Sequence, residues 1–120
     1  MMSEELKKLI KNYGIDVEDE LDVSPFEFAY TFRTRELLAT QYELLDSEDK
    51  KRLAYYDTVL ISRAKEFYEY FKPLKVWGNS NVPIEYWWWH LEKIILGELI
   101  VEVEKNEINY RGNITRLTIK

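Results

Sequence analysis

The chain contains no cysteine and only one histidine, and these scarcities exclude several kinds of chemistry. Without cysteine there is no disulfide, no thiolate nucleophile and no thiolate-bound zinc or iron–sulfur cluster. One histidine does not supply the paired imidazoles that many catalytic metal sites use. We therefore expect no metal site and no cofactor, and no catalytic motif marks the chain as an enzyme.

Long apolar runs and long basic runs are also missing. No stretch is apolar over the roughly 18 residues that a membrane span needs, and the charged start, residues 1–11, does not resemble a secretory signal. The longest basic run is Lys50, Lys51 and Arg52, and the net charge is −5, which disfavours nucleic acid as a partner. We expect a cytoplasmic protein with no membrane partner.

Glycine and proline are scarce as well, with four and three residues, while 46% of the residues are hydrophobic and 32% are charged. This composition excludes a disordered or low-complexity chain. The 120 residues are enough for one domain with its own core. One glutamine and two methionines are a balance typical of heat-adapted proteins. We predict a single domain over residues 1–120, with a mainly helical α+β fold.

The first 23 residues predict a short helix followed by an acidic linker. Ser3 is a good helix cap and Gly14 stands where helices commonly end, so the helix is expected within residues 1–14. Residues 15–23 then form the linker, which contains five acids and no base: Asp16, Glu18, Asp19, Glu20 and Asp22.

Residues 24–96 predict a helical core. A cap at Ser24 starts a helix through Leu45, whose two apolar stripes require cover on two sides. One stripe holds Phe26, Tyr30, Leu37 and Leu44, and the other holds Phe28, Phe32, Ala39 and Tyr42. After a tight turn at Asp46 and Ser47, a long helix continues to Pro73 with apolar residues three and four apart. The two helices form an antiparallel hairpin, and a further helix is expected from Ile84 to Leu96.

Residues 97–120 alternate between apolar and polar side chains, which is typical of β-strands. Turn residues stand at Lys105 and Asn106 and again at Gly112 and Asn113. The pattern predicts a β-hairpin or meander of two or three antiparallel strands, covered on one face by helices.

Three consecutive tryptophans, Trp87 to Trp89, fan over about 200° if the segment is helical. Either the segment packs internally on several sides, or one indole anchors a partner, or the indoles line a ligand pocket. We take Trp77 and Trp89 as candidate partner-binding residues. The acids Asp16, Glu18, Asp19, Glu20 and Asp22 would steer a basic partner toward them. The hypothesis is a small protein–protein interaction module, such as an inhibitor, an adaptor or an antitoxin-like regulator, which binds another protein or itself.

A second hypothesis is a small ligand-binding protein or enzyme. Its pocket would be lined by Tyr30, Arg33, Arg63, Tyr86 and His90. No carboxylate stands one helical turn from His90 to orient it, so a structural role suits this histidine better. In the predicted hairpin Asp57 lies opposite residue 35, and an ion pair with Arg33 or Arg35 would fix the register of the two helices.

Overall fold

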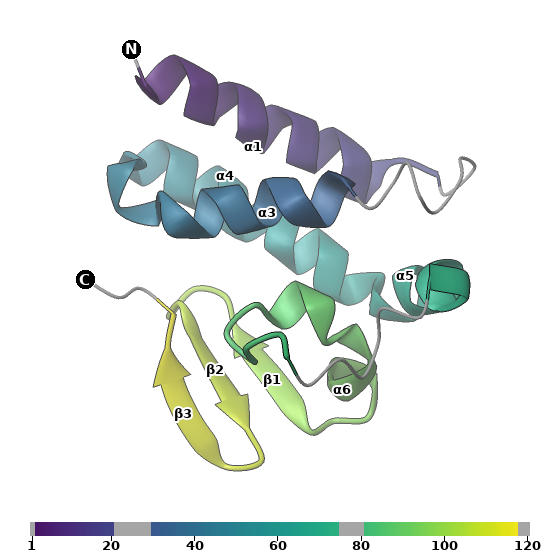
Figure 1. The fold of residues 1–120 in the computed structure, drawn as a ribbon. Coiled ribbons are helices and arrows are strands. Elements are labelled where there is room, and N and C mark those ends of the chain that lie inside the picture. Colours follow the sequence, from purple (N-terminus) through teal and green to yellow (C-terminus); the bar gives the residue numbers. More distant parts are fainter. Residues whose placement is uncertain (1, 21–29, 75–80, 118–120) are drawn as a thin grey trace. The chain divides into compact units, whose positions relative to one another are not determined.

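The structure, a computed structural model, describes residues 2–20, 30–74 and 81–117 (Figure 1). Over these residues the fold is mainly helical with a C-terminal antiparallel sheet, as the sequence predicts. The chain divides into two compact units, residues 1–60 (unit 1) and residues 61–120 (unit 2). The single domain expected from the length stays a prediction. The elements are α1 (Met2–Glu18), α3 (Tyr30–Thr40), η1 (Tyr42–Leu44), α4 (Ser47–Ser62), α5 (Ala64–Phe71), η2 (Lys72–Leu74), η3 (Trp87–Trp89), α6 (Leu91–Ile95), β1 (Leu99–Glu102), β2 (Glu107–Tyr110) and β3 (Asn113–Arg116).

Helix α1 is longer than the sequence suggests, because it continues through Gly14 to Glu18. Gly14 does not end the helix. A Cβ atom at this position would collide with the ring of Tyr56 on α4, so glycine here permits a close approach of two helices. Val17, the next-to-last residue of the helix, is fully buried, and its burial stabilises the added turn. The predicted acidic linker, residues 15–23, therefore begins as helix.

Helices α3 and α4 run in opposite directions and are joined through η1, which confirms the predicted hairpin (Figure 1). The predicted cap of the second helix is also present, since the Asp49 amide donates to the Asp46 carboxylate at 2.8 Å. The start of the first helix lies outside the described residues, and α3 ends at Thr40 rather than Leu45.

The two apolar stripes predicted on the first helix differ in their exposure to solvent. Phe32 is fully buried, whereas Tyr30, Leu37 and Leu44 are 66%, 49% and 57% exposed. The expectation that both stripes are covered is therefore wrong for the described part of that helix. The remaining stripe is an apolar row left open on unit 1.

The long helix expected to reach Pro73 is interrupted at Arg63, whose φ of −106° and ψ of 21° are not helical. Its apolar periodicity nevertheless continues across the break. Leu53, Leu60, Ala64, Phe67 and Phe71 are all buried, as the three-and-four spacing predicts.

The helix expected over Ile84–Leu96 is wrong in its first half. Residues 81–86 form turns, η3 covers only the three tryptophans, and α6 is five residues long. The carbonyls of Val82 and Pro83 lie against the His90 imidazole, at 2.9 and 3.2 Å from Nε2. Burial of Trp87 and Trp88, each 1% exposed, outweighs the weak helix preference of aromatic residues.

The C-terminal strands form the expected meander, in the order β1-β2-β3. Ile100 pairs with Asn109, which pairs with Ile114, so these three side chains share the more exposed face of the sheet. Leu99 and Ile108 are buried on the other face, and α6 contacts β1. The core of unit 2 thus lies between the sheet and helices α5 and α6.

Candidate functional site

The candidate acids lie at the C-terminal end of α1 and just beyond it. Glu18, Asp19 and Glu20 are exposed, while Asp16 is half-buried and accepts a hydrogen bond from Thr31 Oγ1 at 2.8 Å. Burial raises the pKa of the Asp16 carboxyl, although the Thr31 hydrogen bond opposes the shift. Asp16 therefore ties α1 to α3, and only the three acids after it are open to a partner. Asp22 lies outside the described residues.

The start of α3 brings apolar surface to these acids. The Thr31–Asp16 hydrogen bond joins the first turn of α3 to the last turn of α1, and Tyr30, the residue before Thr31, is exposed. The Tyr55 hydroxyl on α4 donates to the Glu18 carboxylate at 3.3 Å, and its ring is 58% exposed. Three helices of unit 1 thus contribute to one surface that is both acidic and apolar.

The tryptophan candidates belong to unit 2. Trp89 is half-buried, and Trp77 lies outside the described residues. The rings of Trp87 and Trp88 meet edge to face at 5.4 Å, and Tyr86 stacks on Trp88 at 5.3 Å. Internal packing therefore accounts for two of the three consecutive tryptophans.

The five residues of the predicted pocket are divided between the two units. In unit 1 the Arg33 guanidinium lies over the Tyr30 ring, 5.6 Å from its centroid. In unit 2 Arg63 donates to Glu66 at 2.6 Å and covers the Phe67 ring. The Tyr30–Arg33 pair is thus in contact within unit 1, and a pocket formed by all five residues stays a prediction.

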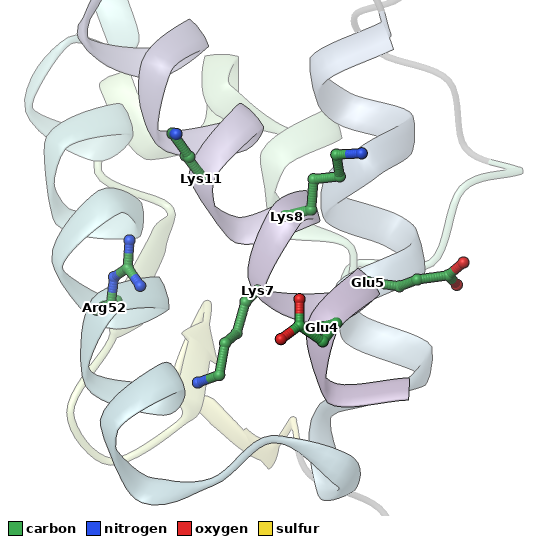
Figure 2. Close-up of a pocket in the computed structure, with 6 residues that line it drawn as sticks. All are labelled: Glu4, Glu5, Lys7, Lys8, Lys11 and Arg52. Carbon is green, nitrogen blue, oxygen red and sulfur yellow. The ribbon is translucent and has the colours of Figure 1, made fainter. Parts of the chain in front are cut away.

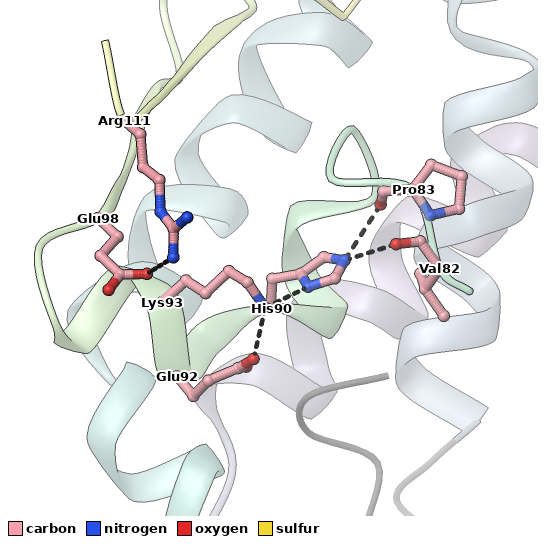
Figure 3. A network of polar contacts seen from close by, with 7 residues as sticks. All are labelled: Val82, Pro83, His90, Glu92, Lys93, Glu98 and Arg111. Carbon is pink, nitrogen blue, oxygen red and sulfur yellow. Dashed lines mark hydrogen bonds and ion pairs between the residues drawn. The ribbon is translucent and has the colours of Figure 1, made fainter. Parts of the chain in front are cut away.

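His90 is 3% exposed and held on both sides of its ring (Figure 3). Because Nε2 faces two carbonyl oxygens it carries the proton, and Nδ1 accepts from the Lys93 ammonium at 3.3 Å. Lys93 is itself paired with Glu92 at 2.8 Å. Burial and the Lys93 charge lower the pKa of His90, so the imidazole is neutral at pH 7. The ring joins the start of α6 to the turn at residues 82–83, which is the geometry of a structural histidine.

The predicted interhelical ion pair is present, and the partner of Asp57 is Arg35 rather than Arg33. Arg35 Nε and Nη2 each donate to one Asp57 oxygen at 2.9 Å, in the two-pronged geometry that a guanidinium favours. The Tyr13 hydroxyl donates to the same carboxylate at 2.6 Å. Burial raises the pKa of Tyr13 well above its usual range, so its proton stays on the phenol. The three residues are buried and join α1, α3 and α4, so they hold unit 1 together.

A basic hollow between α1 and α4 was not foreseen from the sequence. It is about 380 Å³ in volume and is lined by Glu4, Glu5, Lys7, Lys8, Lys11 and Arg52 (Figure 2). The signal was present as three lysines spaced one, three and four positions apart, together with the short basic run that ends at Arg52. Arg52 lies 41 positions after Lys11 in the sequence, so only the packing of α1 beside α4 brings it to the lysines.

Within residues 2–20, 30–74 and 81–117 no cluster of three histidine or acidic side chains is arranged to hold a metal ion. None of the helices in those ranges is both long and apolar enough to cross a bilayer. No protein-family model matches the chain, and comparisons with the curated proteins and with the solved structures gave no match either.

Proposed function

We propose that the chain is a protein–protein interaction module whose unit 1 binds a basic surface of another protein. The observation that carries the proposal is the row of exposed apolar side chains on α3, which begins beside the exposed acids at the end of α1. Large apolar side chains that stay exposed next to charged residues are typical of interaction sites. We call Glu18, Asp19, Glu20, Tyr30 and Leu37 the acidic–apolar surface.

Charge supports a basic partner. Unit 1 contains 14 acidic and eight basic residues, a net charge of −6, whereas unit 2 contains eight acidic and nine basic residues, a net charge of +1. A field of this sign speeds the approach of a basic protein, and the apolar row then contributes the burial that keeps it bound. Exposed tyrosines such as Tyr30 are frequent hot spots of interfaces.

Affinity capture with matched variants tests the proposal. Wild-type protein, the triple variant Glu18→Gln/Asp19→Asn/Glu20→Gln and the single variant Tyr30→Ala are used as baits in lysate of the cells that make the protein. The control Glu102→Gln/Glu104→Gln/Glu107→Gln removes the same three charges from unit 2. We expect a basic protein that wild type and control retain equally and that both unit 1 variants lose.

The captured protein is then purified and its affinity measured against ionic strength. We expect a Kd that rises with salt for wild type and rises less for the triple variant. Retention that is the same for all four baits contradicts the proposal, and so does a retained partner that carries net negative charge. Native mass measurement of the complex gives its stoichiometry, and the identity of the partner separates an inhibitor from an adaptor or an antitoxin-like regulator.

Trp89 tests whether unit 2 also contributes. The variant Trp89→Ala joins the same capture series, and loss of the same partner would extend the interface to the half-buried indole. Retention like that of wild type would confine the interface to unit 1.

A further inference from the structure

The basic hollow between α1 and α4 contains three cations that are not paired with any residue of the described part of the chain. Lys7 is occupied, because its ammonium lies 3.0 Å from the Asp49 carboxylate and 3.5 Å from Asp46. Lys8, Lys11 and Arg52 make no hydrogen bond or ion pair with any residue that the structure describes. In Figure 2, Lys7, Lys11 and Arg52 all lie on the side of α1 that faces α4.

A second hollow adjoins the first and shares Arg52 with it. This hollow has a volume of about 440 Å³ and is lined by Ser47, Glu48, Lys51, Arg52, Tyr55 and Tyr56. Arg52 therefore lines one hollow together with the lysines of α1 and the other together with two tyrosines. Cations and exposed aromatic surface lie next to each other around this one guanidinium.

The chemistry of these groups favours a phosphate. Like charges held close together without a counter-ion repel one another, and a bound anion removes that repulsion. A guanidinium presents paired N–H donors that match phosphate oxygens, and neighbouring ammonium groups add further charge-assisted hydrogen bonds. A dianion neutralises more of the positive charge of these cations than a monoanion does, and is therefore expected to bind more tightly.

The surroundings of the hollows limit the size of the ligand. Glu4 and Glu5 line the first hollow, Glu48 lines the second, and unit 1 as a whole has a net charge of −6. A long polyanion such as nucleic acid would extend past the cations and meet both these acids and the net negative charge of the rest of unit 1, which repel it. A compact ligand stays among the cations.

We propose that the two hollows bind a small organic phosphomonoester. Its phosphate is held by Lys11 and Arg52, with Lys8 at the rim, and its organic part lies on the Tyr55 and Tyr56 side of Arg52. The second hollow adjoins the acidic–apolar surface at Tyr55, whose hydroxyl donates to Glu18, but the phosphate-binding cations belong to neither the acids nor the apolar row, and the proposal does not depend on the function proposed for that surface.

Phenyl phosphate is a suitable probe, because it joins a phosphate dianion to one aromatic ring. Titration of ¹⁵N-labelled protein, followed by backbone amide shifts, is expected to give saturable shifts in α1 and α4. Inorganic phosphate is expected to bind more weakly, since it lacks the ring, and phenyl sulfate more weakly too, since it is a monoanion. Absence of saturable shifts in α1 and α4 overturns the proposal, and so does equal binding of phosphate and sulfate esters.

Two variants remove single cations, and the chain offers a matched control. Arg52→Gln and Lys11→Gln are each expected to weaken phenyl phosphate binding about tenfold, the usual loss for one charge-assisted hydrogen bond. Lys50→Gln removes the same charge from the same basic run, but the Lys50 ammonium lies over the Tyr42 ring, 4.9 Å from its centroid, and does not line either hollow. If all three variants bound phenyl phosphate with equally reduced affinity, the reduction would reflect only the loss of one positive charge, and the proposed site would be contradicted.

Two longer ligands test the size limit. A single-stranded oligonucleotide and a peptide bearing one phosphotyrosine are titrated in the same way. We expect both to bind more weakly than phenyl phosphate. Tighter binding of the oligonucleotide overturns the argument from the surrounding acids, and tighter binding of the peptide overturns the assignment to a small molecule.

Discussion

The two halves of the chain are stabilised by different means. Four of the five buried polar or charged residues in the described part of the chain lie in unit 1, where Asp57 joins Arg35 and Tyr13 across three helices. Unit 2 contains one of the five, His90, and its core is made of packed rings such as Phe67, Phe71, Trp87 and Trp88. Buried hydrogen bonds and an ion pair therefore contribute to the stability of unit 1, whereas the stability of unit 2 depends mainly on the close packing of its apolar side chains.

The comparison is easy to follow experimentally, because all four tryptophans lie at positions 77–89. Tryptophan fluorescence reports on unit 2 alone, whereas hydrogen exchange of the α1 amides reports on unit 1. If the chain is one domain, both signals change at the same urea concentration. Separate midpoints would contradict the single domain expected from the length.

Removal of the shared carboxylate is expected to have the largest effect. Asp57→Ala leaves a buried guanidinium and a buried phenol without their partner, and we expect a loss of about 4 kcal/mol in the free energy of unfolding. The double variant Arg35→Met/Asp57→Ala is expected to lose less, since it buries no unpaired charge. Urea denaturation followed by α1 hydrogen exchange measures both. A loss below about 1 kcal/mol for Asp57→Ala would contradict the pairing.

The matching change in unit 2 removes apolar volume. Leu91 is fully buried at the start of α6, and Leu91→Ala is expected to lower the unfolding free energy by about 3 kcal/mol, because it leaves a cavity. The same loss is expected at low and at high salt, since no charge is involved. Urea denaturation followed by tryptophan fluorescence at two salt concentrations checks this. If the loss of unfolding free energy depended strongly on salt, apolar packing would not be the main source of stability in unit 2.

A smaller effect is expected at Gly14. Gly14→Ala gains helix propensity but forces a methyl group against the Tyr56 ring. We expect a net loss of about 1 kcal/mol in the free energy of unfolding. In the background Tyr56→Ala the same change should be stabilising, because the collision is gone and the propensity gain remains. Thermal unfolding of the four proteins measures the coupling, and additive effects would contradict the close approach of α1 and α4.

The smallest effect concerns His90, the buried histidine of unit 2. The pKa of His90 is lowered from its usual value of 6.5, so below that pH the folded protein binds fewer protons than the unfolded chain. Stability from this residue is complete above pH 6.5 and decreases as the pH falls, by at most about 1.4 kcal/mol per pH unit. Because this is the only histidine, the difference between wild type and His90→Gln isolates it. Parallel curves of unfolding free energy against pH for the two proteins would contradict the shift.

The sequence predicted those features that depend on regular patterns. The apolar spacing from Leu53 to Phe71 and the alternation after Gly97 identified the buried faces correctly, and the cap at Asp46 was found from its residue type alone. The hairpin geometry predicted that Asp57 pairs with Arg33 or Arg35, and the structure selects Arg35. The errors occurred where tertiary contacts outweigh local preference. Gly14 looks like a helix end but serves a close contact, and residues 84–86, expected to be helical, form turns next to the two carbonyls that contact the His90 imidazole.

The candidate sites were predictable to a lesser degree. The acids at the end of α1 stand out in the sequence because they are consecutive or nearly so. The basic hollow does not, because Lys11 and Arg52 are 41 positions apart and meet only when α1 lies beside α4. The exposure of the row on α3 could not be predicted either, because the pattern of apolar residues shows which stripes exist but not which of them a neighbouring helix covers.

The carboxylate of Asp57 also sets an order of events during synthesis. It accepts hydrogen bonds from residues 44 and 22 positions earlier in the chain, so α1 and α3 leave the ribosome before the group that joins them. Nascent chains fold as their segments emerge, so the side chains of Tyr13 and Arg35 stay hydrated until residue 57 has left the ribosome. The second half of the chain is thus already being translated while unit 1 is still unfolded. A ribosome that stalls before residue 57 holds a chain that lacks the carboxylate needed to pair with Tyr13 and Arg35.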